Sequence, residues 1–116
     1  MKKGNGVYSG TVYLSGPMTG RPDYNRAAFE VAANVLRALG NEVINPHELP
    51  EPEGLTGDPE KDWCLYLARD LVLIAYHVNI IVALPAWDES RGSRLEIEFA
   101  RRVGKRIVYM NDEIKQ

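Results

Sequence analysis

The segment NIIVALPAWDESRGSRLEIEFARRV (79–103) decides the fold of this chain. It opens with the continuous apolar run NIIVAL (79–84), which is typical of a strand buried on both faces of a parallel sheet. A polar loop rich in glycine and hydroxyl groups follows, and a helix over about residues 93–103 carries Glu96 in its first turn. The positive end of the helix dipole stabilises a carboxylate there by about 0.3–1 kcal/mol, so we expect Glu96 to remain ionised.

The rest of the chain alternates between strand and helix patterns around this segment. The expected strands are 11–15, 42–45, 79–84 and 106–110, and the expected helices are 25–39, about 59–76 and about 93–103. This alternation predicts an α/β fold: a single-domain three-layer sandwich with a parallel sheet of four or five strands, Rossmann- or flavodoxin-like. Residues 1–10 are expected to be a flexible leader, and residues 46–58 a long functional loop or mobile flap.

Composition excludes several classes of protein. The 116 residues fit one domain, and 45% hydrophobic with 26% charged residues is ordinary for a globular chain. A net charge of −2 with scattered lysines and arginines argues against binding a nucleic acid polymer. No apolar segment is long enough for a membrane, so we expect a cytoplasmic protein without a membrane partner. Cys64 is expected to be a buried thiol, and His47 and His77 are too few for a metal site, so we expect no metal and no cofactor.

Two carboxylates are candidates for chemistry. Asp70 lies in the apolar helical run LYLARDLVLIAY (65–76), where an unpaired acid costs free energy. Desolvation would keep a proton on Asp70 while Glu96 stays charged, which supplies the acid and the nucleophile of glycoside cleavage. Structural roles explain the same residues: Ser93 and Glu96 match a capping box, and Asp70 can pair with Arg69 or with a loop arginine.

The loop SGPMTGR (15–21) follows the first strand and resembles an anion cradle, because its glycines permit close backbone approach and an arginine follows. An ordinary turn explains the loop equally well. Tyr13 precedes it and is either a site residue or a core residue. Trp63 is expected in the core, whereas Trp87 in a polar loop could stack on a flat ligand. Ligands of open parallel sheets bind at this carboxyl edge.

Several motifs together resemble those of one enzyme family. They are YLSGPMTG (13–20), GNEVINP (40–46), Asp70-Leu71 and ALPAWDESRGSRLEIEFA (83–100). In this order and spacing they resemble the nucleoside 2-deoxyribosyltransferase superfamily, and most of all its small, largely uncharacterised branch from phage and bacterial genomes. The likeness covers about residues 12–110, so residues 11–116 are expected to form one domain of this kind.

The resemblance implies roles for individual residues. It makes Glu96 the nucleophile on the anomeric carbon, Asp70 the acid that handles the base, and Tyr13 the group that orients Glu96. Gly92 and Ser93 match the pair that precedes the nucleophile. With the residues of the two edge loops, the substrate-binding candidates are Ser15, Gly16, Met18, Arg21, Trp87, Ser90, Gly92 and Ser93.

Ser90 is an informative departure from the family pattern. Nucleoside transferases have an aspartate there, which would repel a 5′-phosphate, whereas a serine hydroxyl beside a helix start favours one. Ser90 and Arg21 resemble the nucleoside 5′-monophosphate N-glycosidases, so we expect hydrolysis of a (deoxy)nucleoside 5′-monophosphate with release of free base. The alternatives are transfer of the sugar to a second base and a non-catalytic nucleotide-binding module. We also expect a homodimer or higher homo-oligomer, whose neighbouring subunit completes the pocket.

Overall fold

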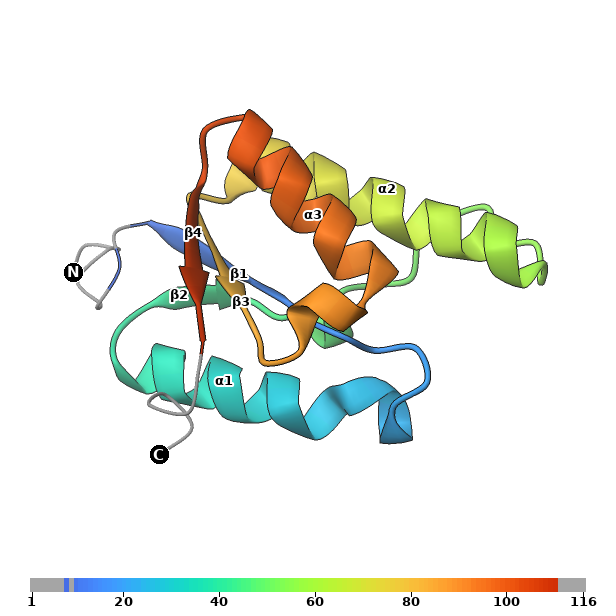
Figure 1. The fold of residues 1–116 in the computed structure, drawn as a ribbon. Coiled ribbons are helices and arrows are strands. Elements are labelled where there is room, and N and C mark those ends of the chain that lie inside the picture. The colour runs from blue at the N-terminus through green and yellow to red at the C-terminus, as the bar shows by residue number, and fades with distance from the viewer. Residues whose placement is uncertain (1–7, 9, 111–116) are drawn as a thin grey trace.

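Four short strands form one parallel sheet at the centre of the computed structural model, which describes Tyr8 and residues 10–110 (Figure 1). In chain order the strands are β1 (Thr11–Ser15), β2 (Glu42–Ile44), β3 (Ile80–Ala83) and β4 (Arg106–Tyr109). Their order in the sheet is β2-β1-β3-β4, with Val12 of β1 opposite Val43 on one side and Ile80 on the other. The chain adds β2 on one side of β1 and then crosses to add β3 on the other side. The carboxyl ends of β1 and β3 therefore form the switch point of the sheet.

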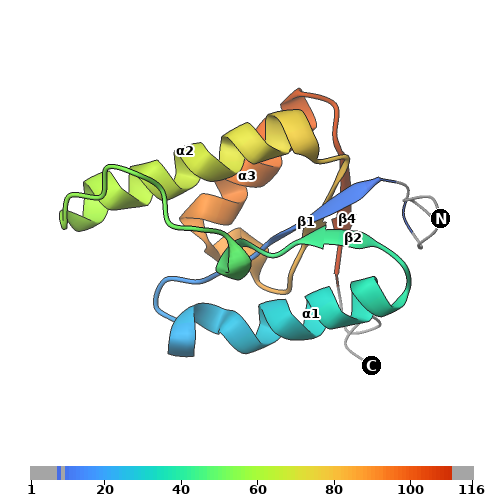
Figure 2. The same cartoon turned by 180° about the vertical axis from the view of Figure 1, so that it is seen from behind.

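Helices cover both faces of the sheet, which confirms the predicted three-layer α/β sandwich. One face carries α1 (Arg26–Ala38), and the other carries α2 (Pro59–His77) and α3 (Arg91–Arg102), as Figures 1 and 2 show. The described residues also form three short 3-10 helices: η1 (Pro22–Asn25), η2 (Pro46–Glu48) and η3 (Trp87–Glu89). They lie in segments predicted as loops, except for Asn25, which was predicted to begin a helix.

The alternation of side chains along β1 creates two separate cores. Val12 and Leu14 point to the α1 side, where Phe29 is fully buried, while Tyr13 points to the side of α2 and α3. Because successive residues of a strand face opposite sides, Ser15 lies on the same face as Tyr13. β1 thus contributes two apolar side chains to the core on the α1 side and two polar side chains to the side of α2 and α3.

The helix boundaries follow the predicted caps with one exception. Asp58 caps α2 by accepting from the amides of Glu60 and Lys61 at 3.0 and 3.1 Å. Gly40 follows α1 with a φ of 94°, which only glycine adopts without strain. The exception is α3, which begins at Arg91 rather than near residue 93. Its start is set by a cap at Ser90, which the sequence pattern did not identify.

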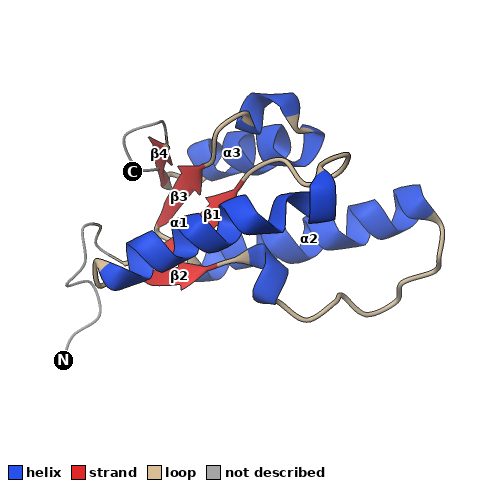
Figure 3. Ribbon diagram, turned by 90° about the horizontal axis from the view of Figure 1, so that it is seen from below, coloured by secondary structure: helices blue, strands red, loops and turns tan. Residues whose placement is uncertain are grey.

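The first half of α2 extends past the sheet, as Figure 3 shows. Only Asp70 and Ile74 of its 19 residues are buried. Cys64 lies in this projecting half and is exposed, so the prediction of a buried thiol is wrong. Trp63 is half-buried and belongs to neither core, which corrects the expectation of a core residue. Both errors arise because the apolar run of α2 is longer than the layer available to cover it.

Most of the predicted leader lies outside the described residues. Tyr8 is described: its amide donates to Asn41 Oδ1 at 3.0 Å, and its ring packs against the α1-side core. No helix of the described residues is long and apolar enough to cross a membrane.

Candidate active site

Glu96 is the centre of a buried polar cluster on the α2 and α3 side of the sheet. Its carboxylate accepts from the Tyr13 hydroxyl at 3.1 Å and from the Ser15 hydroxyl at 2.7 Å, one donor to each oxygen. The Ser15 and Ser93 hydroxyl oxygens lie 3.0 Å apart. Because Ser15 gives its single proton to Glu96, Ser93 is the donor to Ser15. The carboxylate is only 7% exposed and is held in a defined orientation.

Two elements bring this cluster together. Tyr13 and Ser15 are two residues apart on β1, so both reach the same face. Ser93 and Glu96 are three residues apart on α3, so both lie on the side that packs on the sheet. The cluster forms beside the switch point between β1 and β3, where parallel sheets bind their ligands.

Glu96 does not cap α3, which corrects the capping-box alternative. The Ser90 hydroxyl oxygen accepts from the Ser93 amide at 3.2 Å and is the N-cap. Since the helix begins at Arg91, Glu96 lies in its second turn and is turned toward β1. The helix dipole therefore stabilises the charge of Glu96 less than the predicted first-turn position would.

Asp70 contributes the second carboxylate from α2 and is also 7% exposed. The Arg69 guanidinium holds its Oδ1, from Nη2 at 2.9 Å and from Nε at 3.0 Å. The ion pair weighed as a structural role for Asp70 is therefore present. Asp70 also lies beside Glu96 and Tyr13, because its negative charge acts on the pKa of both.

Burial raises the pKa of Glu96 well above its usual range, and the neighbouring charge of Asp70 raises it further. The hydrogen bonds from Ser15 and Tyr13 lower this pKa but do not reverse the shift. This direction is opposite to the expected tendency of Glu96 to remain ionised, because burial outweighs the helix dipole. Burial and the two carboxylates also raise the pKa of Tyr13 well above 10, which keeps its phenol a neutral donor.

Of the site residues predicted in the first loop, Gly16 and Met18 have packing roles, and Arg21 makes an ion pair. Gly16 packs tightly, since a Cβ atom there would lie 2.9 Å from Leu84 Cβ. Met18 packs against the α1-side core, away from the Glu96 cluster. Arg21 reaches the loop after β3 and pairs with Glu89 at 2.9 Å, so the two loops of the switch point are linked.

The residues predicted around η3 also have structural partners. Trp87 packs against the core beneath α3, with its ring centre 5.5 Å from that of Tyr109. Gly92 lies in the first turn of α3, where a Cβ atom would lie 3.9 Å from the Trp63 ring and 4.0 Å from the Ser90 hydroxyl oxygen.

Sequence reasoning missed a contact at the start of α3. The Arg91 guanidinium lies 3.6 Å from the centre of the Trp63 ring and pairs with Glu60 at 2.7 Å. These contacts join the N-terminal ends of α2 and α3. Nothing in the local pattern of either helix indicates this pairing, because the residues are 28 and 31 positions apart.

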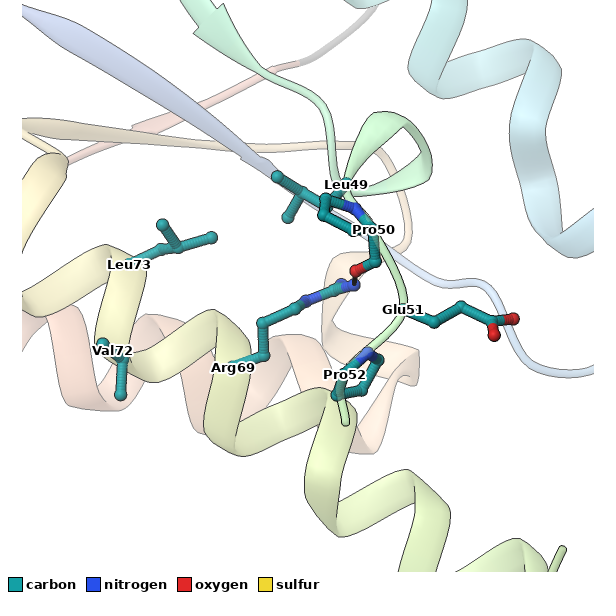
Figure 4. Close-up of a pocket in the computed structure, with 7 residues that line it drawn as sticks. All are labelled: Leu49, Pro50, Glu51, Pro52, Arg69, Val72 and Leu73. Atoms are coloured by element: carbon teal, nitrogen blue, oxygen red, sulfur yellow. Dashed lines mark hydrogen bonds between the residues drawn. The ribbon is translucent and has the colours of Figure 1, made fainter. Parts of the chain in front are cut away.

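Two cavities stand out on the described part of the chain, and neither is lined by Glu96. One, of about 450 Å³, is an apolar groove between α2 and the segment after η2 (Figure 4). Its lining residues are Leu49, Pro50, Glu51, Pro52, Arg69, Val72 and Leu73. The other, of about 390 Å³, lies on the α1 side and is lined by residues that include Arg21, Asn25 and Met110. The described part of the chain holds no group of three His, Cys, Asp or Glu side chains arranged for a metal.

The fold and the site define an α/β protein whose parallel sheet carries a buried carboxylate pair beside its switch point. The chain belongs to the family described as a domain of unknown function (DUF4406), whose model matches residues 10–109. A comparison with curated protein sequences gives no match.

Proposed function

We propose that this protein is a hydrolase that cleaves the N-glycosidic bond of a (deoxy)nucleoside 5′-monophosphate through a glycosyl intermediate on Glu96. One observation carries the proposal: a buried carboxylate is oriented by Tyr13 and Ser15, with a second carboxylate, Asp70, beside it. Paired carboxylates of this kind supply both the proton and the nucleophile that glycoside cleavage needs.

The raised pKa of Glu96 fits a mechanism in which the carboxylate pair holds one proton before reaction. The bond between C1′ and the base nitrogen breaks, and its electron pair stays with the base. The base takes the proton of the pair, which leaves Glu96 ionised to form the bond to C1′. Water then attacks C1′, the Glu96 carboxylate departs, and a proton of that water returns to the pair.

Two residues at the edge of the site, Ser90 and Arg21, support the preference for a 5′-monophosphate. Ser90 places a hydroxyl, rather than a carboxylate, at the start of α3, where the helix dipole favours an anion. Arg21 lies on the neighbouring loop and is paired with Glu89, an exposed partner that a phosphate dianion can replace. A serine at position 90 does not by itself select deoxyribose, so the proposal covers both sugars.

We extend the proposal to a homo-oligomer, a dimer or larger, in the cytoplasm. Neither of the two cavities described above is lined by Glu96, so the proposal places the substrate against a neighbouring copy rather than in either cavity. A neighbouring copy would close the site. We place the protein in the cytoplasm because its proposed substrates, nucleoside monophosphates, are found there.

The test is chromatographic detection of free base from a panel of nucleosides and their 5′-monophosphates. We expect base release from monophosphates alone, and its loss in Glu96→Gln. Glu98→Gln is the matched control, because Glu98 is two residues further along α3, exposed, and paired with Arg102 at 2.8 Å. Mass spectrometry of acid-quenched reactions should detect the glycosyl adduct on Glu96.

Other results would reject the proposal in favour of a defined alternative. New nucleotide formed only when an acceptor base is added would identify a transferase with the same intermediate. Ligand binding without base release, and equal in Glu96→Gln, would identify a binding module. A monomeric mass in solution with full activity would contradict the oligomer.

A further inference from the structure

Arg69 uses its guanidinium to join two parts of the molecule. Two of its nitrogens hold Asp70 Oδ1, at 2.9 and 3.0 Å, and the third, Nη1, donates to the carbonyl oxygen of Pro50 at 2.9 Å. Figure 4 shows the side chain crossing from α2 to the segment after η2. Only 18% of the Arg69 side chain is exposed, and contacts from all three of its nitrogens fix the orientation of this guanidinium fork.

The segment that Arg69 holds is the wall of the apolar groove. Leu49 and Pro52 line this groove on either side of Pro50. A second attachment lies further along, where the Asp62 carboxylate accepts from the amides of Thr56 and Gly57 at 2.7 and 2.8 Å. Residues 49–57 thus form a strap that is attached to α2 at two points, and only the first attachment reaches a site carboxylate.

We propose that Arg69 is a positioning residue that fixes the Asp70 carboxylate beside Glu96 and couples it to the strap of residues 49–57. A ligand that enters the groove and displaces the Pro50 carbonyl would therefore act on the carboxylate pair through one side chain. The catalytic meaning of this inference rests on the proposed function, whereas its effect on the charge of the pair does not.

Arg69 should affect Glu96 because it determines how strongly the charge of Asp70 acts on the Glu96 carboxylate. The Arg69 guanidinium pairs with the Asp70 carboxylate in its buried position and fixes where that charge lies relative to Glu96. Without Arg69 the Asp70 carboxylate is no longer held in place beside Glu96, so its negative charge acts on Glu96 from a greater distance. Glu96 should consequently ionise at lower pH.

Few other charged groups act on Glu96 from the surrounding elements. β1 contributes the neutral Tyr13 and Ser15, and β3 is apolar throughout. On η3, Glu89 is paired with Arg21, and on β4 the Tyr109 hydroxyl accepts from Arg101. The Arg69–Asp70 pair is thus the charged contact to perturb.

The experiment measures the titration of Glu96 directly, by NMR of its carboxyl carbon in Arg69→Met and Arg69→Gln. Arg69→Gln keeps a donor for the Pro50 carbonyl without the charge, so it carries the test if Arg69→Met does not fold. The matched control is Arg37→Met. Arg37 makes a similar fork on the other side of η2, to Glu48 at 2.7 and 3.0 Å and to the Val43 carbonyl at 2.8 Å.

We expect the titration midpoint of Glu96 to fall by about one pH unit or more in both Arg69 variants and to stay unchanged in Arg37→Met. The pH profile of base release should move in the same direction. Arg69→Lys keeps the charge but not the fork, so we expect it to keep the midpoint while amide exchange along residues 49–57 becomes faster.

The outcomes separate this inference from the proposed function. A shifted midpoint without base release from any variant, the wild type included, would support the positioning role and overturn the hydrolase. An unchanged midpoint in folded Arg69→Gln, or an equal shift in Arg37→Met, would overturn the positioning role whatever the activity.

Discussion

Replacing Glu96 by glutamine should stabilise the protein, and more so as the pH rises. Because folding raises the pKa of Glu96, its favourable contribution is complete below the ordinary value near 4.5 and is lost as the pH rises through the native pKa. Each unit of such a shift corresponds to about 1.4 kcal/mol. Glutamine removes the buried charge and its repulsion by Asp70, keeps an acceptor oxygen for Tyr13 or Ser15, and can donate to Asp70. Allowing for one weakened hydrogen bond, we expect a gain of about 1–3 kcal/mol at pH 8 and little change at pH 4.

Urea denaturation of wild type and Glu96→Gln between pH 4 and pH 8 measures this difference. The control is Glu98→Gln, whose exposed side chain should change the free energy of unfolding by less than about 0.5 kcal/mol at either pH. A Glu96→Gln variant that is less stable than wild type at pH 8, or whose difference does not depend on pH, would refute the reasoning. Neither measurement needs a substrate.

Two further substitutions test the neighbours of this site. Tyr13→Phe removes a hydrogen bond that orients Glu96 and lowers its pKa. Base release at pH 7 should therefore fall about tenfold or more, and the pH above which the pair loses its proton and activity declines should rise. Tyr109→Phe, at an exposed phenol, should leave both unchanged. A pH-independent loss in Tyr13→Phe would contradict this account. Gly16→Ala should lower the free energy of unfolding by about 1–3 kcal/mol, because the new Cβ would lie 2.9 Å from Leu84 Cβ. Gly92→Ala should change it by less than about 1 kcal/mol, because its Cβ would lie 3.9 Å from the nearest atom of the Trp63 ring. Equal losses in the two glycine variants would show that packing at Gly16 is not the cause.

The sheet and its helices were predictable because their patterns are local. The apolar run that forms β3 and the cap at Asp58 each fix an element with a few adjacent residues. The turn before α1 was not predictable in this way. Asp23, Tyr24 and Asn25 adopt positive φ angles of 49°, 53° and 63°, which non-glycine residues disfavour. A distant contact supports them: His47 Nε2 lies 3.0 Å from the Tyr24 carbonyl oxygen.

The juxtaposition of Tyr13 and Glu96 was predictable, whereas the charge of the carboxylates was not. The positions of Tyr13 and Glu96 on their elements follow from periodicity, and the structure does bring them together. Which carboxylate has the raised pKa depends on burial and on the side chains across the sheet, neither of which adjacent residues determine. The start of α3 shows the same limit: the pattern indicated a capping box of Ser93 and Glu96, whereas Ser90 is the cap and Glu96 is buried in the second turn.

Structural roles account for part of this carboxylate pair and leave the rest unexplained. Arg69 compensates Asp70, and Ser90 supplies the cap that Glu96 was expected to provide. Within the described residues no cation pairs with Glu96, whose two oxygens accept from Tyr13 and Ser15. A well-packed apolar side chain at position 96 would avoid the desolvation cost altogether. A carboxylate that costs stability and is held in one orientation is what a nucleophile requires, which is why the glutamine variant should gain stability at the same time as it loses activity.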